Sequence, residues 1–579
     1  MKRKIAKLIS LLLLLAFLGG CTGGNRGDAE SLQQPSSEPE ISDTPVAEPS
    51  PSPTSEPEPE RGFDYEYKAP EAGKYDGSSD LIALSWEEYE SKPCRIQEGT
   101  VIKICLPEVY AQSWGNLATG SFDSSIYDGL LYMHMNDPED VRGLLAESWS
   151  CSDDRLEWTF NIREGVKFAD GTECDANAIA KAWDMIAERR ADAMGYTIES
   201  WEARSDYEFV VTLSSYFAWF EQYICSLYIP STAAIELYGW DSYKACVGTG
   251  PYYIDFDSFF ENYRRNIPLK ANRDYFLPER YPSIETVNIV MQEDTGTQIN
   301  ALLEGKLHAG MLNYIDADIS RLDGYGGTVK KAYKPGGAIW LDPSDEEILK
   351  IKEVRTAFAR FADFDEINAS VYKGEGLVKD SIWAAGTSVY LETDAYYYAP
   401  DEGHALLASV GLSSSDIVLE QYEIYPKELL AILSEQFSRE GVTLAIEEYE
   451  ATLNVRDSYK KRPLFTSANY STSIKPYNAW EIDRQQLGFI DFKHCRQELY
   501  DTELYELMQS EYEQIQSADT WSELLEHCEN LTRYAQDDMC VIGGIQEPLW
   551  LAVDAKLKNA VYFCTDRADY SLQFYYSYM

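Results

Sequence analysis

The sequence predicts a mixed α/β protein of more than one domain, preceded by an export segment and a polar tether. About 515 residues follow the tether, and 45% of the chain is hydrophobic, which is sufficient for a large core. Residues 156–162 have the alternation of a half-buried β-strand, and residues 175–183 have the spacing of an amphipathic helix. We therefore expect strands and helices to share the core of the folded body.

The first 20 residues have the pattern of an export signal. Four cations lie within residues 1–7, an apolar run extends from Leu8 to Leu18, and Gly19 and Gly20 follow as small residues. The apolar run is about half of the ~20 residues that a membrane-spanning helix needs. We therefore do not expect a permanent transmembrane anchor.

The quartet Leu18-Gly19-Gly20-Cys21 resembles a bacterial lipobox. The resemblance implies that signal peptidase II cuts before Cys21 and that its thiol carries lipid, which would hold the protein at the membrane. An ordinary secreted protein with a chance cysteine is the alternative. Residues 21–61 are rich in Ser, Pro and Glu and cannot bury enough apolar surface to fold, so we expect a disordered, extended tether. The predicted location is extracytoplasmic, lipid-anchored on the cell surface or periplasmic side.

Composition and motifs argue against several classes of protein. The net charge of −47 leaves nothing to neutralise phosphates, so nucleic acid is not an expected partner. None of the five histidines shares metal-ligand spacing with another, and no G-x-S-x-G or Walker-type loop is present. We predict no catalytic residues, no metal and no cofactor, and hence a binding protein rather than an enzyme.

The cysteines leave one question open. Ten remain besides Cys21, and none forms a C-x-x-C pair, so neither a zinc ribbon nor a thioredoxin-type centre is indicated. Export permits disulfides, but a chain of this size does not need them, and the sequence fixes no pairing.

The stretch from Leu145 to Trp183 predicts a β-hairpin followed by a helix. Asp170-Gly171 is a tight-turn pair, and Asp175 is a good N-cap for the helix. The apolar side chains of the predicted strand alternate with polar ones, as one buried face requires. They are Leu156, Trp158, Phe160 and Ile162.

Two later stretches predict helices that serve as scaffold. In both, apolar residues recur three and four positions apart, and the second helix follows Asp519 or Thr520 as its cap. The predicted buried positions are Val354, Ala357, Phe358 and Phe361 in the first helix, and Leu524, Leu525, Cys528 and Leu531 in the second.

Several motifs, in a fixed order, carry a more specific resemblance. They are LAESW at 145–149, WTF at 158–160, REGVKF at 163–168, a strand at 206–213, VGTGPY at 247–252, ANRDYF at 271–276, and VRTAF at 354–358 followed by Ala362-Asp363. From about Val101 to the C-terminus, this order resembles the family 5 extracellular solute-binding proteins. These are the large receptors of ABC importers for oligopeptides, dipeptides and nickel.

The resemblance implies a two-lobed periplasmic-binding-protein-like fold (type II, cluster C), in which two α/β lobes flank a cleft and lobe I carries an extra subdomain. The implied ranges are 1–20 for the signal peptide, 21–61 for the lipidated tether, 62–115, 240–335 and 545–579 for lobe I, 116–239 for the extra subdomain, and 336–544 for lobe II. A chain that crosses between lobes more than once makes a hinge, and a ligand that contacts both lobes favours the closed state.

The function that the resemblance implies is capture of a small solute and its delivery to an ABC permease, with separate subunits hydrolysing ATP. We expect an oligopeptide ligand and a monomeric receptor. An oligosaccharide or a metal chelate remains an alternative ligand, since aromatic residues make up 13% of the chain and aromatic faces stack on sugars. The other class of function is a ligand sensor that signals through a different partner.

Positional analogy with the family gives the expected cleft contacts. They are Tyr110, Ser113 and Trp114 on a first loop, with Asn469, Tyr470 and Trp480 from lobe II. Residues 466–477 depart from the aspartate-rich run that the family often has there, and hydroxyls, an amide and Lys475 replace it. Capture of a peptide amino terminus by this segment is therefore in doubt.

The glycine-rich stretch at 247–252 allows two interpretations. Gly248 and Gly250 suit a backbone that must bend where the chain passes between lobes, and Pro251 prevents the turn from becoming a helix. Both a plain structural turn and a direct ligand contact remain open for this stretch.

Overall fold

The computed structural model describes most of the chain after residue 91. Contacts divide the chain into residues 1–59 and 60–579, and every described residue lies in the second unit. The described ranges are 66–67, 81–83, 92–106, 122–134, 140–189, 197–240, 242–259, 266–291, 294–313, 318–333, 338–341, 347–379, 397–422, 427–447, 464–466, 502–537, 541–564, 570–572 and 574–579.

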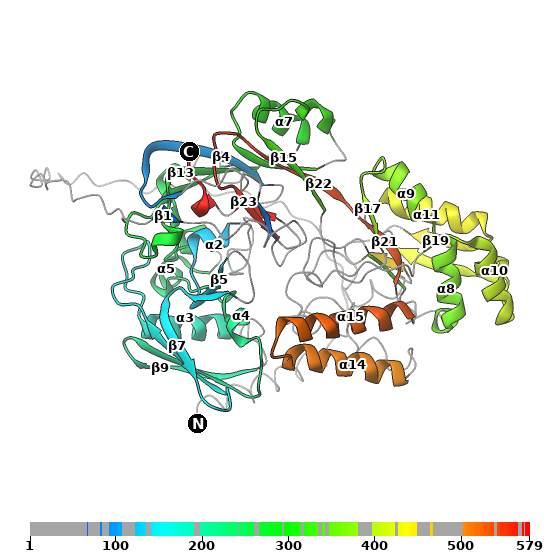
Figure 1. Ribbon diagram of the computed structural model, residues 1–579, viewed down its shortest axis with the longest axis horizontal. Coiled ribbons are helices and arrows are strands. Elements are labelled where there is room, and N and C mark those ends of the chain that lie inside the picture. Colours follow the sequence, from blue (N-terminus) through cyan, green and yellow to red (C-terminus); the bar gives the residue numbers. More distant parts are fainter. Residues whose placement is uncertain are drawn as a thin grey trace, which may run out of the picture. The chain divides into compact units, whose positions relative to one another are not determined.

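The largest sheet has seven strands in the order β11-β12-β13-β4-β14-β22-β15 (Figure 1). β4 pairs in parallel with β13 and β14, whereas the other pairs are antiparallel. Ile104 and Cys105 of β4 lie in two different apolar clusters, so both faces of the sheet are covered, and helix α7 (Thr295–Leu303) contributes to the second cluster. The strands are β4 (Gln97–Leu106), β11 (Tyr252–Ile254), β12 (Asn266–Ala271), β13 (Ile284–Met291), β14 (Ala309–Asn313), β15 (Thr328–Tyr333) and β22 (Pro548–Val553).

A second, antiparallel sheet has the order β7-β8-β10-β9 and packs with helix α3. Trp158, Phe160 and Ile162 of β8 are buried, as predicted for the strand face, whereas Leu156 lies just before the strand and is half-buried. The Asp175 carboxylate accepts a hydrogen bond from the backbone N–H of Ala178, as the predicted N-cap requires. The elements are β7 (Ala146–Cys151), β8 (Glu157–Ile162), β9 (Ile198–Ser205), β10 (Glu208–Leu213), α3 (Ala176–Arg189), α4 (Phe220–Ile224) and α5 (Thr232–Tyr238). We call this region, residues 146–238, the antiparallel subdomain.

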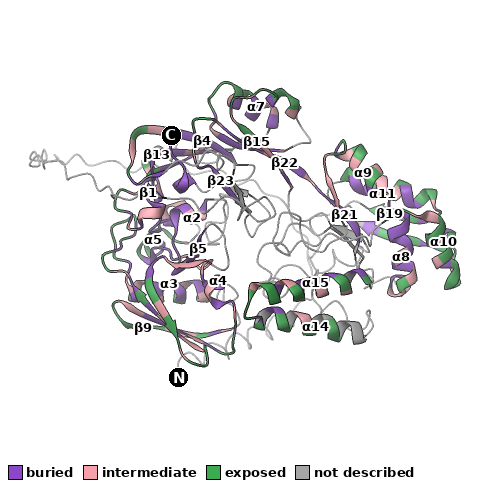
Figure 2. Cartoon of the chain, viewed as in Figure 1, coloured by how far each residue is buried: buried purple, intermediate pink, exposed green. Residues whose placement is uncertain are grey.

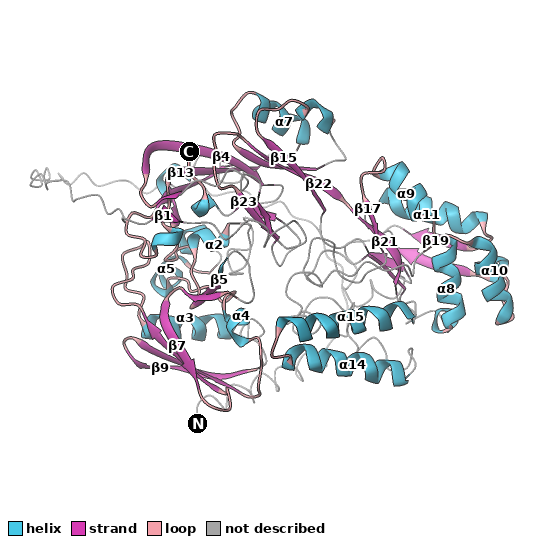
Figure 3. Cartoon of the chain, in the orientation of Figure 1, coloured by secondary structure: helices cyan, strands magenta, loops and turns pink. Residues whose placement is uncertain are grey.

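A third group of elements has its own apolar core. The antiparallel sheet β17-β21-β16-β20 and the parallel pair β18-β19 lie with helices α8 to α11 (Figure 3). All four apolar positions that the sequence predicted for the first scaffold helix are buried in this core. The elements are β16 (Ala338–Leu341), α8 (Lys352–Phe361), α9 (Phe364–Val371), β17 (Leu377–Lys379), α10 (Pro400–Ser409), β18 (Val418–Tyr422), α11 (Lys427–Arg439), β19 (Thr443–Glu447), β20 (Leu464–Thr466) and β21 (Val541–Gln546).

Helices α14 (Thr502–Ser517) and α15 (Trp521–Asp537) form an antiparallel pair, which we call the helical hairpin. Thr520 caps α15: its hydroxyl accepts from the N–H of Glu523, and the Glu523 carboxylate accepts from the N–H of Thr520. Leu524, Cys528 and Leu531 are buried as predicted and Leu525 is half-buried, while the opposite side of α15 is exposed (Figure 2).

The chain passes twice between the seven-stranded sheet and the β17-β21-β16-β20 sheet, and paired strands flank the two crossings. One runs from β15 to β16 and the other from β21 to β22. Tyr333 lies opposite Pro548 in one sheet and Ala338 lies opposite Gly544 in the other. The strands that flank the two crossings are thus antiparallel partners in both sheets. The predicted lobe boundaries at 335/336 and 544/545 remain predictions.

The remaining strands of the described ranges form three small sheets. They are β1 (Glu66–Tyr67) with β3 (Lys92–Pro93), β5 (Leu131–Met133) with β6 (Val141–Gly143), and β2 (Leu81–Ala83) with β23 (Val561–Cys564) and β24 (Tyr570–Leu572). No helix within the described ranges has the length and apolar character needed to cross a membrane. Seven described cysteines are thiols rather than halves of a disulfide: Cys94, Cys105, Cys151, Cys174, Cys225, Cys246 and Cys528.

Candidate functional site

The predicted ligand contacts fall on two segments whose ends the structure locates. The first segment, 107–121, joins the end of β4 to the short helix α2 (Asp123–Ile126), and the second, 467–500, follows β20. The predicted contacts Tyr110, Ser113, Trp114, Asn469, Tyr470 and Trp480, like the predicted lipidation site Cys21, lie outside the described residues. The structure therefore describes the frame that carries the first segment.

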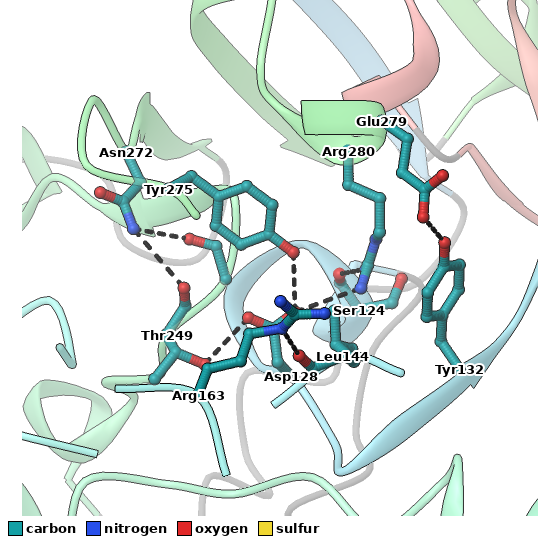
Figure 4. Close-up of polar contacts among 11 residues, drawn as sticks. Ser124, Asp128, Tyr132, Leu144, Arg163, Thr249, Asn272, Tyr275, Glu279 and Arg280 are labelled. Carbon is teal, nitrogen blue, oxygen red and sulfur yellow. Dashed lines mark hydrogen bonds and ion pairs between the residues drawn. The ribbon is translucent and has the colours of Figure 1, made fainter. Parts of the chain in front are cut away.

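Asp128 is the centre of that frame (Figure 4). Its carboxylate is fully buried and accepts hydrogen bonds from Thr249 Oγ1 at 2.9 Å and from the Tyr275 hydroxyl at 3.1 Å. Arg280 Nη1 pairs with the same carboxylate at 3.2 Å. Burial raises the pKa of Asp128 above its usual range, and the Arg280 charge and the hydroxyl donors oppose that rise.

Arg280 ties this centre to the start of α2. Its Nη2 donates to the carbonyl oxygen of Ser124 at 2.8 Å, and its guanidinium lies over the rings of Tyr132 and Tyr575, with its central carbon 5.3 and 4.5 Å from their centroids. Because the side chain is 3% exposed, these contacts replace water around the charge. The arrangement fixes α2.

A second buried cation lies next to this centre. Lys92 is fully buried and its amine donates to the carbonyl oxygen of Tyr281. Burial lowers the pKa of Lys92 to about 7, with the Arg280 charge acting in the same direction. The carboxylate of Glu279 accepts a hydrogen bond from the Tyr132 hydroxyl and forms an ion pair with Arg142 Nη1 at 3.3 Å.

The glycine-rich stretch is part of the same frame, and its glycines have a structural role there. A Cβ atom on Gly248 would lie 2.2 Å from the Ile126 carbonyl oxygen, and one on Gly250 would lie 2.5 Å from the Ile126 carbonyl carbon. These glycines therefore allow two backbones to pack closely. They lie on the connection from β10 to β11, whereas the crossings between the seven-stranded sheet and the β17-β21-β16-β20 sheet lie at 334–337 and at Glu547. Thr249 is 1% exposed with its hydroxyl on Asp128, so its side chain is structural.

The sequence did not single out Asp128, Arg280 or Lys92. Asp128 and Arg280 are 152 positions apart, and no local periodicity joins residues at such a separation. The only signal was indirect, since Thr249 and Tyr275 belong to two of the motifs quoted above. Asn272, in the same motif as Tyr275, donates to the Gly250 carbonyl oxygen at 3.0 Å, so these two motifs bind each other.

Solved structures share this architecture. NikA from Brucella suis, in complex with Fe(III)-EDTA, superposes with a TM-score of 0.66 at 16% identity, covering 82% of this chain and 99% of NikA. The oligopeptide-binding protein AppA from Bacillus subtilis, in complex with a nonapeptide, gives a TM-score of 0.62 at 15% identity, covering 84% and 100%. The fold is therefore that of the two-lobed periplasmic binding proteins, as the sequence predicted.

The sequence comparisons define the family. The model of bacterial extracellular solute-binding proteins, family 5 Middle, matches residues 140–485, which is more than half of the chain. The chain belongs to this family, and the predicted resemblance is confirmed. The glutathione-binding protein GsiB of Escherichia coli strain K12 is 32% identical over 137 residues, or 23% of this chain. The match spans about a quarter (26%) of GsiB.

Proposed function

We propose that this protein is the substrate-binding lipoprotein of an ABC import system. It captures a small solute between its two lobes and delivers it to a membrane permease, while separate subunits hydrolyse ATP and this chain breaks no bond. One structural observation carries the proposal: the seven-stranded sheet and the β17-β21-β16-β20 sheet are joined by two crossings, and the strands that flank the crossings are antiparallel partners in both sheets. Such a pair of crossings supports hinge closure around a ligand.

The proposed ligand is an oligopeptide. In support, the solved neighbours include AppA with a nonapeptide and DppA from Helicobacter pylori in complex with the peptide STSA. A metal chelate and a sugar acid derivative also occur among the neighbours, as Fe(III)-EDTA in NikA and mannopinic acid in MoaA of A. tumefaciens R10. The choice among these classes rests on a binding experiment.

That experiment is thermal unfolding of the full-length protein with peptide pools, oligosaccharides and metal chelates. A ligand at about 100 times its dissociation constant adds about 2.7 kcal/mol of stability, which raises the melting temperature visibly. We expect a rise with peptides. A rise in melting temperature only with oligosaccharides or metal chelates would assign the ligand to that class instead. No rise with any pool would favour the sensor function.

We propose that Tyr110, Ser113, Trp114, Asn469, Tyr470 and Trp480 contact this ligand. The Trp114→Ala variant is expected to weaken binding by tenfold or more, because a buried aromatic anchor commonly carries much of a binding energy. Thermal unfolding without ligand should change little. Titration of the ligand identified above into both proteins measures the effect, and equal affinities would remove Trp114 from the site.

We also propose that lipid on Cys21 anchors the protein and that residues 22–61 serve as its tether. The Cys21→Ser variant is expected to appear in the soluble fraction of the producing cell, because it lacks the thiol that would carry lipid. Fractionation with an antibody against the body measures this. A variant that stays with membranes as fully as the native protein would defeat the anchor.

A further inference from the structure

The helical hairpin lies within the range predicted for lobe II, but its buried side chains pack against the antiparallel subdomain, which was predicted to belong to lobe I. The nearest described elements before and after it in the chain are β20 and β21, which are both strands of the β17-β21-β16-β20 sheet. Its buried side chains Leu524, Cys528 and Leu531 nevertheless share one apolar cluster with Phe160 and Trp183 of the antiparallel subdomain. The hairpin therefore links the antiparallel subdomain to the β17-β21-β16-β20 sheet, which the crossings at 334–337 and Glu547 join to the seven-stranded sheet.

An aromatic contact joins the hairpin to the antiparallel subdomain. Trp521, the first residue of α15, meets Trp219 edge to face, with the ring centroids 5.6 Å apart and the planes at 74°. Trp219 is buried in the subdomain, whereas Trp521 is half-buried. An edge-to-face pair of this kind is favourable and geometrically specific.

A polar trio lies beside the tryptophan pair. The Tyr216 hydroxyl donates to Asp519 Oδ1 at 2.6 Å, and Arg155 Nη1 donates to the Tyr216 hydroxyl at 2.9 Å. Arg155 also pairs with Asp519 at 3.3 Å, and the two side chains are 51% and 67% exposed. Salt and water reach this trio, so its strength is adjustable in a way that a buried ion pair is not.

The backbone conformation of Arg155 independently indicates that its side chain has a function at this contact. This residue has a φ of +54° in the turn between β7 and β8, a conformation that favours glycine. Strained non-glycine residues of this kind are concentrated at functional contacts, and here the retained side chain is the one that reaches Tyr216 and Asp519. A glycine at 155 would suit the turn better and would lose both contacts.

We propose that the helical hairpin is a clasp, which holds the two lobes together in the absence of ligand through the Trp219–Trp521 pair and the Arg155–Tyr216–Asp519 trio. The inference rests on the proposed function, because a clasp acts only if the lobes separate. By favouring the joined arrangement, the clasp reduces the differential affinity that a ligand must supply to close the lobes. Transport adjusted in this way would respond to ionic strength.

The test uses the full-length protein without any ligand, so that a missing ligand or transport partner does not affect the result. Hydrogen exchange by mass spectrometry follows the amides of residues 502–537, and X-ray scattering gives the radius of gyration. For Trp521→Ala we expect exchange in the hairpin to accelerate tenfold or more and the radius of gyration to rise. Amides of β8 and β10 should keep their native rates.

Two further variants separate the clasp from general damage. Arg155→Gly should accelerate hairpin exchange and raise the radius of gyration, while the melting temperature of the antiparallel subdomain stays equal or rises. Arg204→Ala removes an ion pair with Glu157 inside the subdomain and should leave the hairpin unchanged. Raising NaCl from 0.05 to 0.5 M should reproduce part of the Arg155→Gly effect in the native protein only, because screening acts on the exposed trio.

Three outcomes would overturn the clasp. Unchanged hairpin exchange in Trp521→Ala would mean that the contact contributes no stability. Faster exchange throughout β8 and β10 would make the hairpin a permanent part of the subdomain core. Faster exchange in the hairpin with an unchanged radius of gyration would make it a local element with no influence on the lobes.

Discussion

Two arginine–aspartate pairs in this protein have similar lengths and opposite surroundings. Arg280 and Asp128 meet at 3.2 Å with side chains 3% and 0% exposed, whereas Arg155 and Asp519 meet at 3.3 Å and are 51% and 67% exposed. Breaking the buried pair leaves a charge without water, and breaking the exposed pair leaves both groups solvated. The buried pair thus holds one region in shape, and the exposed pair joins the antiparallel subdomain to the helical hairpin.

The largest expected effect comes from the buried pair. Arg280→Met leaves the Asp128 carboxylate buried without its cation, and we expect it to reduce the free energy of unfolding by about 3–5 kcal/mol. Urea unfolding measures this. Arg273→Met is the matched control, because Arg273 pairs with Glu98 at the surface, with both side chains about half exposed (52% and 51%), and its loss should cost less than about 1 kcal/mol. An equal loss of unfolding free energy in the two variants would show that the buried pair contributes no more to stability than the exposed one.

The buried amine of Lys92, next to the Asp128–Arg280 pair, should make the stability of the protein depend on pH. Its pKa is about 7 in the folded protein and 10.5 in the unfolded chain, so between these values the unfolded chain binds one more proton. The free energy of unfolding therefore gains a contribution that rises with pH, by up to about 1.4 kcal/mol per unit between pH 7 and 10.5.

Lys92→Met should abolish this contribution, so that the stability difference between the variant and the native protein changes steadily from pH 7 to pH 9. Urea unfolding at three pH values in this window measures the difference. Lys306→Met, at a side chain that is 73% exposed, should give a difference that does not vary with pH. A constant difference for Lys92→Met as well would show that Lys92 stays charged in the folded protein.

The smallest expected effect is at the exposed trio. Tyr216→Phe removes only the hydroxyl that donates to Asp519, and we expect a loss of about 0.2–1 kcal/mol in the free energy of unfolding, further reduced in high salt. Urea unfolding at low and high NaCl measures it. A loss of 3 kcal/mol or more would assign the trio to the same class as the Asp128–Arg280 pair.

Local patterns in the sequence predicted much of the secondary structure. The alternation around Trp158, the Asp175 cap, the buried face at Phe358 and the Thr520 cap all lie where expected. These features depend on residues a few positions apart, so the physics that forms them is present in the sequence itself. The order of the motifs then predicted the family and the two-lobed fold.

Contacts between distant residues could not be predicted in the same way. The partners of Asp128 lie 121 to 152 positions away, and the docking of α15 onto Trp219 joins residues that no periodicity relates. The close approach of Gly248 and Gly250 to Ile126, more than 120 positions away, was likewise not expected from the sequence, which suggested only a bend between lobes. The ligand contacts expected around Trp114 and Tyr470 stay predictions, since they lie outside the described residues.

The paired crossings also determine what a change in chain length would do during evolution. From Tyr333 to Ala338 the chain advances five residues, while from Pro548 back to Gly544 the opposite strand advances four. This difference of one residue leaves the pairs on both sides intact, because each sheet sets its own register through its other strands. A single insertion at 334–337 should therefore lengthen only that connection, while the unchanged crossing at Glu547 still limits how far the two sheets can separate.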